Sequence, residues 1–213
     1  MKAVQVVSRG KAQFVDVPKP QLQPGYVLVR PHLVALCGSD NWMLNHSRPE
    51  EYPFPPGTTG HEVIAQVEAI DADNTSVTVG DLTLTLAPDH RAMAEFYLAP
   101  IENVLLLPAG KTPEELLMAQ QLGTVVFGTR KLSSLVGQTV VIMGQGSVGL
   151  FHDFMLRRIG AHRIIAIEPV KERLAHGVRM GVDEAVDVTG QAATDAIMDL
   201  TNGEGADLVV EAV

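Results

Sequence analysis

A glycine-rich turn near the middle of the chain limits the folds that it can adopt. The short apolar run from Thr139 ends in Gly144, Gly146 and Gly149, which is the spacing G-x-G-x-x-G, and a helix is predicted from Leu150 to Arg158. In such a strand-turn-helix unit the first glycine makes the turn, the second leaves room for a phosphate and the third lets the helix pack closely. The turn predicts a dinucleotide site, although a strand-turn-helix unit without a ligand would carry the same glycines.

The start of this predicted helix would supply the contacts with the phosphate. The first N–H groups of a helix have no acceptor within it, and its N-terminus carries a partial positive charge. We therefore expect Ser147 and Val148 to present their backbone N–H groups to a pyrophosphate.

An acidic residue stands where a dinucleotide site needs one. Glu168 ends the next predicted strand, about twenty residues past the turn, where a carboxylate can hold the adenosine ribose hydroxyls. The alternative is a solvated acid at the start of the helix that follows Pro169. A carboxylate would repel the extra phosphate of NADP and so favours NAD. Lys171 and Arg173 weaken that preference, whether as surface charges or as groups near the adenine, and NADP stays open.

Strands and helices alternate after the glycine turn. The periodicity predicts strands at 163–168, 185–188 and 206–213, separated by helices at 170–180 and 192–200. Strands joined by helices of this length form a parallel sheet with right-handed crossovers. The pattern predicts the first part of a doubly wound Rossmann sheet.

The first hundred residues are different, because short β-branched runs alternate with proline and glycine. Strands are predicted at 1–7, 26–36, 61–70, 81–87 and 95–99, which together suggest a small irregular β-barrel. A helix then begins at a capping box formed by Thr112 and Glu115 and is predicted to run to about Ser133, with Gly123 as the place for a break. The predicted domains of this α/β chain are 1–124 and 125–213.

The composition of the chain disfavours several classes of function. The 213 residues carry a formal charge of -9, which disfavours binding to nucleic acid or to an anionic membrane. No apolar run approaches a membrane span, and Met1 begins a polar segment, so a soluble cytoplasmic protein is expected. The single cysteine, Cys37, excludes an internal disulfide and a four-cysteine zinc module.

Two short motifs in the first half contain residue types that bind zinc. One is Cys37-Gly38-Ser39-Asp40 and the other is Gly60-His61-Glu62. A catalytic zinc needs three protein ligands and an open position, and cysteine, histidine and glutamate are all competent. Taken singly, a buried cysteine that acts as a small apolar residue and a histidine held by a hydrogen bond are the alternatives.

These two motifs, with Ala94-Glu95-Phe96-Tyr97 and the glycine turn, resemble the medium-chain dehydrogenase/reductase family, in its branch of zinc-dependent alcohol and polyol dehydrogenases. The resemblance covers the whole chain. It implies a catalytic domain built on a chaperonin-10-like β-barrel, followed by a Rossmann domain. It also implies zinc at Cys37 and His61, with Glu62 as a direct or second-sphere ligand.

The resemblance assigns roles to two further residues. Asp40 would orient His61, as histidine ligands usually require. Ser39 would pass the alcohol proton towards solvent, a role compatible with that of a helix N-cap.

The implied reaction is hydride transfer between a nicotinamide cofactor and a secondary alcohol or polyol, with zinc as a Lewis acid on the substrate oxygen. The implied partners are a small alcohol or carbonyl substrate and, in the full-length form, other copies of the chain. A noncatalytic dinucleotide-binding fragment and a zinc-free reductase of the same family remain as alternatives.

The chain also departs from the family pattern. The four-cysteine structural zinc lobe is missing between Asp81 and Ala94, and Gln120 and Gln121 stand where many relatives have a further zinc ligand. Trp42 takes the place of a proton-relay histidine. Relatives continue well past the position of Val213, so we expect a chain truncated at its C-terminus.

Overall fold

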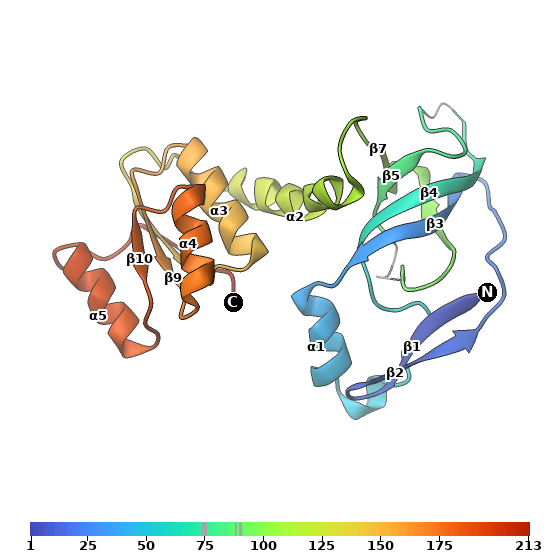
Figure 1. Ribbon diagram of the computed structural model, residues 1–213, viewed down its shortest axis with the longest axis horizontal. Helices are drawn as coiled ribbons and strands as arrows, with labels where there is room; N and C mark the ends of the chain where they lie inside the picture. The colour runs from blue at the N-terminus through green and yellow to red at the C-terminus, as the bar shows by residue number, and fades with distance from the viewer. Residues whose placement is uncertain (74–75, 88, 90) are drawn as a thin grey trace. The chain divides into compact units, whose positions relative to one another are not determined.

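The computed structural model describes residues 1–73, 76–87, 89 and 91–213. The chain forms two compact units, Met1–Gln120 and Gln121–Val213 (Figure 1). The domain boundary placed after residue 124 stays a prediction. Within the described residues, every helix is too short or too polar to cross a membrane.

The first unit is built from antiparallel strands. A hairpin pairs β1 (Lys2–Ser8) with β2 (Lys11–Asp16), and a separate five-stranded sheet has the order β6-β3-β4-β5-β7. The sheet strands are β3 (Tyr26–Ala35), β4 (Glu62–Asp71), β5 (Leu82–Thr85), β6 (Tyr97–Pro100) and β7 (Val104–Leu106). Alternate residues of β3 and β4 point into one core that includes Val27, Val29, Val63, Ala65 and Val67. This alternation is why these segments form strands of a half-buried sheet.

The five strands predicted in this half are present, with ends that differ by one or two residues. Three elements were not predicted, namely β2, β7 and the helix α1 (Gly38–His46). In α1 only Asp40 is buried, so its sequence shows no apolar stripe. Strand β2 is almost wholly exposed, with Phe14 76% exposed, so it shows no alternation of burial. Short 3-10 turns lie at Pro49–Glu51 and Ile101–Asn103.

The helix α2 (Pro113–Thr129) begins at the predicted capping box. The N–H of Glu115 donates to Thr112 Oγ1 at 3.2 Å, and the N–H of Thr112 donates to Glu115 Oε2 at 3.1 Å. The helix continues through Gly123 without a break and ends at Thr129. The predicted break at Gly123 and the predicted extension to Ser133 were therefore wrong.

The second unit contains a parallel sheet of four strands in the order β10-β9-β8-β11. The strands are β8 (Thr139–Met143), β9 (Arg163–Ile167), β10 (Glu184–Val186) and β11 (Leu208–Glu211). The helices are α3 (Ser147–Arg158), α4 (Lys171–Met180) and α5 (Gln191–Leu200). This confirms the predicted alternation of strands and helices and the α/β fold class.

Both faces of the parallel sheet are covered. Ile142 of β8 packs with Leu156 of α3 and Leu174 of α4 on one face. Its neighbour Val141 packs with Ala193 of α5 on the other. The chain continues to β9 on one side of β8 and returns as β11 on the other, and ligands bind such sheets at the carboxyl ends of the strands where this reversal occurs. The glycine turn after β8 lies at that place.

Candidate functional site

Strand pairing brings the two zinc-type motifs together. In the register of β3 and β4, Ala35 pairs with Glu62, so Cys37, two residues past the end of β3, lies near His61, the residue before β4. One ligand atom from each of Cys37, His61 and Glu62 lies within 4.8 Å of the other two. The structure thus groups the three residues that the motifs singled out.

Asp40 holds the two motifs in place. Its side chain is 4% exposed, and its two oxygens accept the N–H of Cys37 at 2.8 Å and the N–H of Gly60 at 2.9 Å. His61 Nδ1 lies 3.8 Å from Asp40 Oδ1. A buried carboxylate that accepts two backbone N–H groups is well anchored, and this one faces the imidazole of a candidate ligand.

The donor atoms of this cluster fit zinc. A thiol sulfur, an imidazole nitrogen and a carboxylate oxygen converge; each is a ligand type that zinc binds, and three protein ligands leave a fourth position open, as in catalytic zinc sites. Glu62 is 1% exposed, while Cys37 and His61 are half-buried. The cluster is therefore partly accessible through Cys37 and His61.

The other predicted residues of this region lie on α1. Ser39 is exposed at the second position of the helix, and Trp42 is 55% exposed. The N-cap residue is Cys37, so the expectation of Ser39 as the cap was wrong. Ser39 lies two residues past the N-cap position, inside the first turn of the helix.

The glycine turn in the second unit has a conformation that requires two of its three glycines, Gly144 and Gly149. Gly144 has a φ of +90°, and its N–H donates to Ile167 O at 2.8 Å. A Cβ on Gly149 would overlap the carbonyl oxygen of Gly144, whereas a Cβ on Gly146 would meet nothing within 4 Å. Gly146 is the N-cap of α3, which places Ser147 and Val148 in the first turn, where N–H groups lack helical acceptors.

Glu168 is tied to this turn. It is 4% exposed, its Oε2 accepts the N–H of Gln145 at 2.9 Å, and its Oε1 accepts the N–H of Val170 at 3.0 Å. The exposed guanidinium of Arg173 lies 3.7 Å from the same carboxylate. Glu168 therefore fixes the backbone of the glycine turn through its hydrogen bond with Gln145. Gln145 was missed by sequence reasoning, because a glutamine between two glycines has no pattern that marks it as buried.

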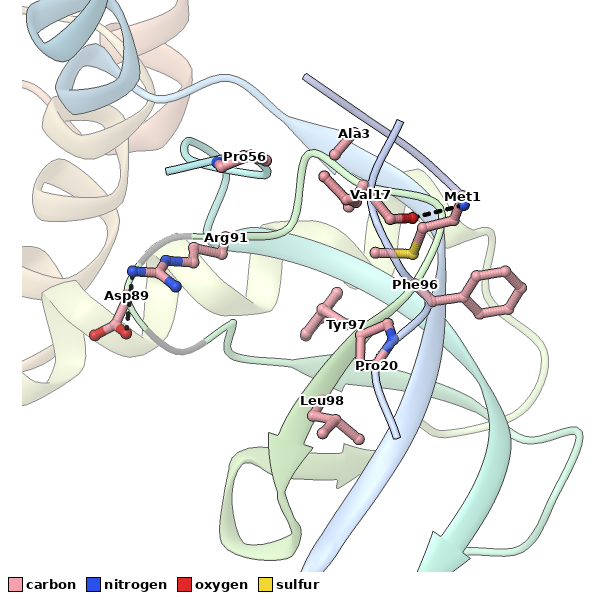
Figure 2. A pocket seen from close by; sticks show the side chains of 11 residues that line it. Met1, Ala3, Val17, Pro20, Pro56, Asp89, Arg91, Phe96, Tyr97 and Leu98 are labelled. Atoms are coloured by element: carbon pink, nitrogen blue, oxygen red, sulfur yellow. Dashed lines mark hydrogen bonds and ion pairs between the residues drawn. The ribbon is translucent and has the colours of Figure 1, made fainter. Parts of the chain in front are cut away.

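A separate hollow of about 260 Å³ lies in the first unit (Figure 2). Its lining includes Met1, Val17 and Phe96, and the Met1 ammonium group donates to Val17 O at 2.8 Å. None of the zinc-type residues lines it, so this hollow is distinct from the candidate metal site.

Comparisons with known proteins agree with the motifs. Residues 23–109 match the family model described as the alcohol dehydrogenase GroES-like domain, and residues 147–213 match the model described as zinc-binding dehydrogenase. Together the two matches cover well over half of the chain. The chain belongs to the medium-chain dehydrogenase/reductase family, in its zinc-dependent alcohol and polyol dehydrogenase branch.

Individual relatives of this dehydrogenase are similar over its whole length. It is 26% identical over 260 aligned positions to an alcohol dehydrogenase of Cupriavidus necator, covering 100% of this chain and 70% of the relative. It is 29% identical over 245 positions to a D-arabitol-phosphate dehydrogenase of Enterococcus avium, covering 100% and 68%. The chain thus spans about 70% of the length of these relatives.

A solved structure shows the same fold. The alcohol dehydrogenase TADH from Thermus sp. ATN1 superposes with a TM-score of 0.80 at 27% identity, covering 100% of this chain and 70% of that one. The GroES-like domain and the Rossmann-type sheet predicted from the sequence are thereby confirmed.

Proposed function

We propose that this dehydrogenase transfers a hydride between a nicotinamide cofactor and a secondary alcohol or polyol, with a ketone or aldehyde as substrate in the reverse direction. The observation that carries the proposal is the convergence of Cys37, His61 and Glu62 within 4.8 Å. The dehydrogenases to which the chain is similar support it.

Cys37, His61 and Glu62 would hold one zinc ion. When bound, zinc polarises a substrate oxygen as a Lewis acid. The chain contributes positioning, because the Asp40 carboxylate fixes the backbone of Cys37 and Gly60 and faces the His61 ring. Ser39 is exposed at the start of α1, and we assign to its hydroxyl the transfer of the alcohol proton towards solvent.

The glycine turn would bind the cofactor. Gly144, Gly146 and Gly149 shape the turn, and Ser147 and Val148 offer N–H groups to the pyrophosphate.

Glu168 and Arg173 would lie at the adenosine ribose. The buried carboxylate favours NAD, since it would repel a ribose phosphate, while the exposed Arg173 would attract one. We expect NADH to bind more tightly than NADPH, as measured by fluorescence titration. Tighter binding of NADPH would overturn this preference.

Metal analysis of the purified chain tests the zinc site. We expect about one zinc per chain, in line with one catalytic set of ligands, and its loss in the Cys37→Ala and His61→Ala variants. The matched control is His46→Ala, which removes an exposed histidine from the last turn of α1. A wild-type chain without zinc would sink the proposal.

Turnover is tested separately with NAD and a panel of secondary alcohols and polyols. Reduction of NAD that is lost with Cys37→Ala supports the enzyme. Binding of NADH together with zinc, but no turnover of any alcohol in the panel, would favour a noncatalytic binding protein. A cytoplasmic location and assembly of the full-length enzyme into a homo-oligomer remain predictions from the sequence.

A further inference from the structure

Asp153 is an acid on the buried face of α3. Its side chain has no exposed surface, and it lies on the same face as Gly149 and Leu156. An apolar residue is expected at such a position, because an ionised carboxylate without a compensating partner is costly to bury. An acid at this place needs a specific partner.

That partner is Gln145, which lies between the first two glycines of the turn. Its side chain is 1% exposed and folds inwards. Its Nε2 donates to Asp153 Oδ1 at 3.3 Å and to the carbonyl oxygen of Gly144 at 3.3 Å. The amide therefore links the interior of α3 to the first residue of the turn.

Helix α4 leaves space for this pair at Gly177. Glycine is unfavourable within a helix, so its presence there needs a packing reason. A Cβ on Gly177 would overlap Gln145 Oε1 and would lie 3.3 Å from Asp153 Oδ2. These two oxygens thus face the same point of α4, and among the described residues neither has a hydrogen-bond partner.

Two acceptor oxygens cannot bond to each other, but a hydrogen bond between them becomes possible when the acid carries a proton. We propose that Asp153 and Gln145 form a cyclic acid–amide pair that positions the glycine turn for the dinucleotide. The Asp153 hydroxyl donates to Gln145 Oε1 while Gln145 Nε2 donates to Asp153 Oδ1. Asp153 is a positioning residue in this scheme, which rests on the proposed function only for the identity of the ligand.

The surroundings favour the protonated acid. Burial raises the pKa of Asp153 to about 7, although the Gln145 amide acts in the opposite direction. In the described part of the chain, no ion pair joins Asp153 to a charged group. The titratable and charged groups around Asp153 have other partners or are uncharged. Glu168 accepts the Gln145 N–H and is paired with Arg173, while Arg157 is bonded to Asp183. His176 contacts Arg179, and burial lowers the pKa of His152.

The pair has a signature that does not depend on a cofactor. A raised pKa in the folded state means that its contribution to stability is complete below the ordinary pKa near 3.8, falls as the pH rises towards about 7, and levels off above that value. Asp153→Asn keeps both hydrogen bonds, since its amide can donate to Gln145 Oε1, but it does not titrate. We expect the folding equilibrium constant of the wild type to fall relative to Asp153→Asn by up to about tenfold per pH unit in this window.

Cofactor binding tests the positioning role. We expect Asp153→Leu to weaken NADH binding roughly tenfold, as loss of a buried hydrogen-bonded pair would, and Asp153→Asn to restore it at about pH 6. At about pH 8 the wild type should bind NADH more weakly than Asp153→Asn, because the ionised acid no longer donates to Gln145. Asp199→Asn, an exposed acid of α5 in the same unit, is the matched control.

The outcomes separate this inference from the proposed function. A wild type that binds neither NADH nor NADPH defeats the dinucleotide site, while the pH dependence of unfolding still decides whether the pair is protonated. Equal pH dependence of unfolding in wild type and Asp153→Asn overturns the acid–amide pair. Unchanged NADH affinity in a folded Asp153→Leu variant overturns the positioning role.

Discussion

The carboxylate of Asp40 accepts the backbone N–H of Gly60 at 2.9 Å and so joins α1 to the turn before β4. Its second oxygen accepts the N–H of Cys37. Because Cys37 is a candidate ligand and His61 follows Gly60, one buried side chain controls the separation of two candidate zinc ligands.

Replacing Asp40 with asparagine should weaken zinc binding. The amide keeps only one oxygen for the two backbone N–H groups and loses the negative charge beside His61. We expect zinc affinity to fall about 10- to 100-fold, as is typical when a residue that supports a metal ligand is changed. Competition with a chelator measures this. Asp71→Asn, at the exposed end of β4, should leave the affinity unchanged, and an equal loss in both variants would contradict the role of Asp40.

Two glycines of the turn should respond differently to alanine. A Cβ at Gly149 would overlap the Gly144 carbonyl oxygen, so Gly149→Ala should destabilise the second unit and weaken NADH binding. A Cβ at Gly146 meets only open space, so the Gly146→Ala variant should fold normally. It should bind NADH more weakly, because the added methyl group would occupy the space that the pyrophosphate needs. Urea unfolding and NADH titration separate the two effects. Normal NADH affinity in Gly146→Ala would argue against phosphate binding there.

The capping box of α2 should contribute measurably to stability. Thr112→Ala removes the hydroxyl that accepts the Glu115 N–H and should cost about 1 kcal/mol of unfolding free energy. Urea unfolding followed by circular dichroism gives the value. Glu114→Ala changes an exposed acid in the same turn that lies outside the box, so a loss as large in this control would rule out a specific effect of the cap.

Tyr97 should make the first unit sensitive to alkali. Its hydroxyl donates to Thr85 O at 3.1 Å, and burial raises the pKa of Tyr97 well above its ordinary value of 10.0. The stability that this group contributes is complete below pH 10.0 and falls as the pH rises further, because only the unfolded chain then loses the proton.

Tyr97→Phe should therefore cost about 1 kcal/mol at neutral pH and show a shallower alkaline loss of stability than the wild type. Thermal unfolding at a series of pH values measures both. Parallel alkaline profiles in the two proteins would exclude Tyr97 as the cause.

Regular local patterns were the predictable part of the fold. The apolar alternation of β3 and β4, the Thr112 capping box and the strand-helix alternation after Gly144 all located elements that the structure contains. Helix α1 and strand β2 gave no such pattern. Strand β2 has no buried residue and forms by pairing with β1 in a hairpin, while the one buried residue of α1, Asp40, is bonded to Gly60, which is distant in the sequence. Neither feature leaves a periodic pattern of apolar residues in the segment itself.

The sequence by itself determined which residue types were available, namely Cys37, His61 and Glu62 as donors and the glycine spacing of the turn. Only the tertiary structure decided that Ala35 pairs with Glu62, which brings the three donors within 4.8 Å. It also placed Asp153 against Gln145 and Gly177. The physical reason is that strand register and helix packing are collective outcomes of burying one face of each element, so distances between remote residues are absent from any local pattern.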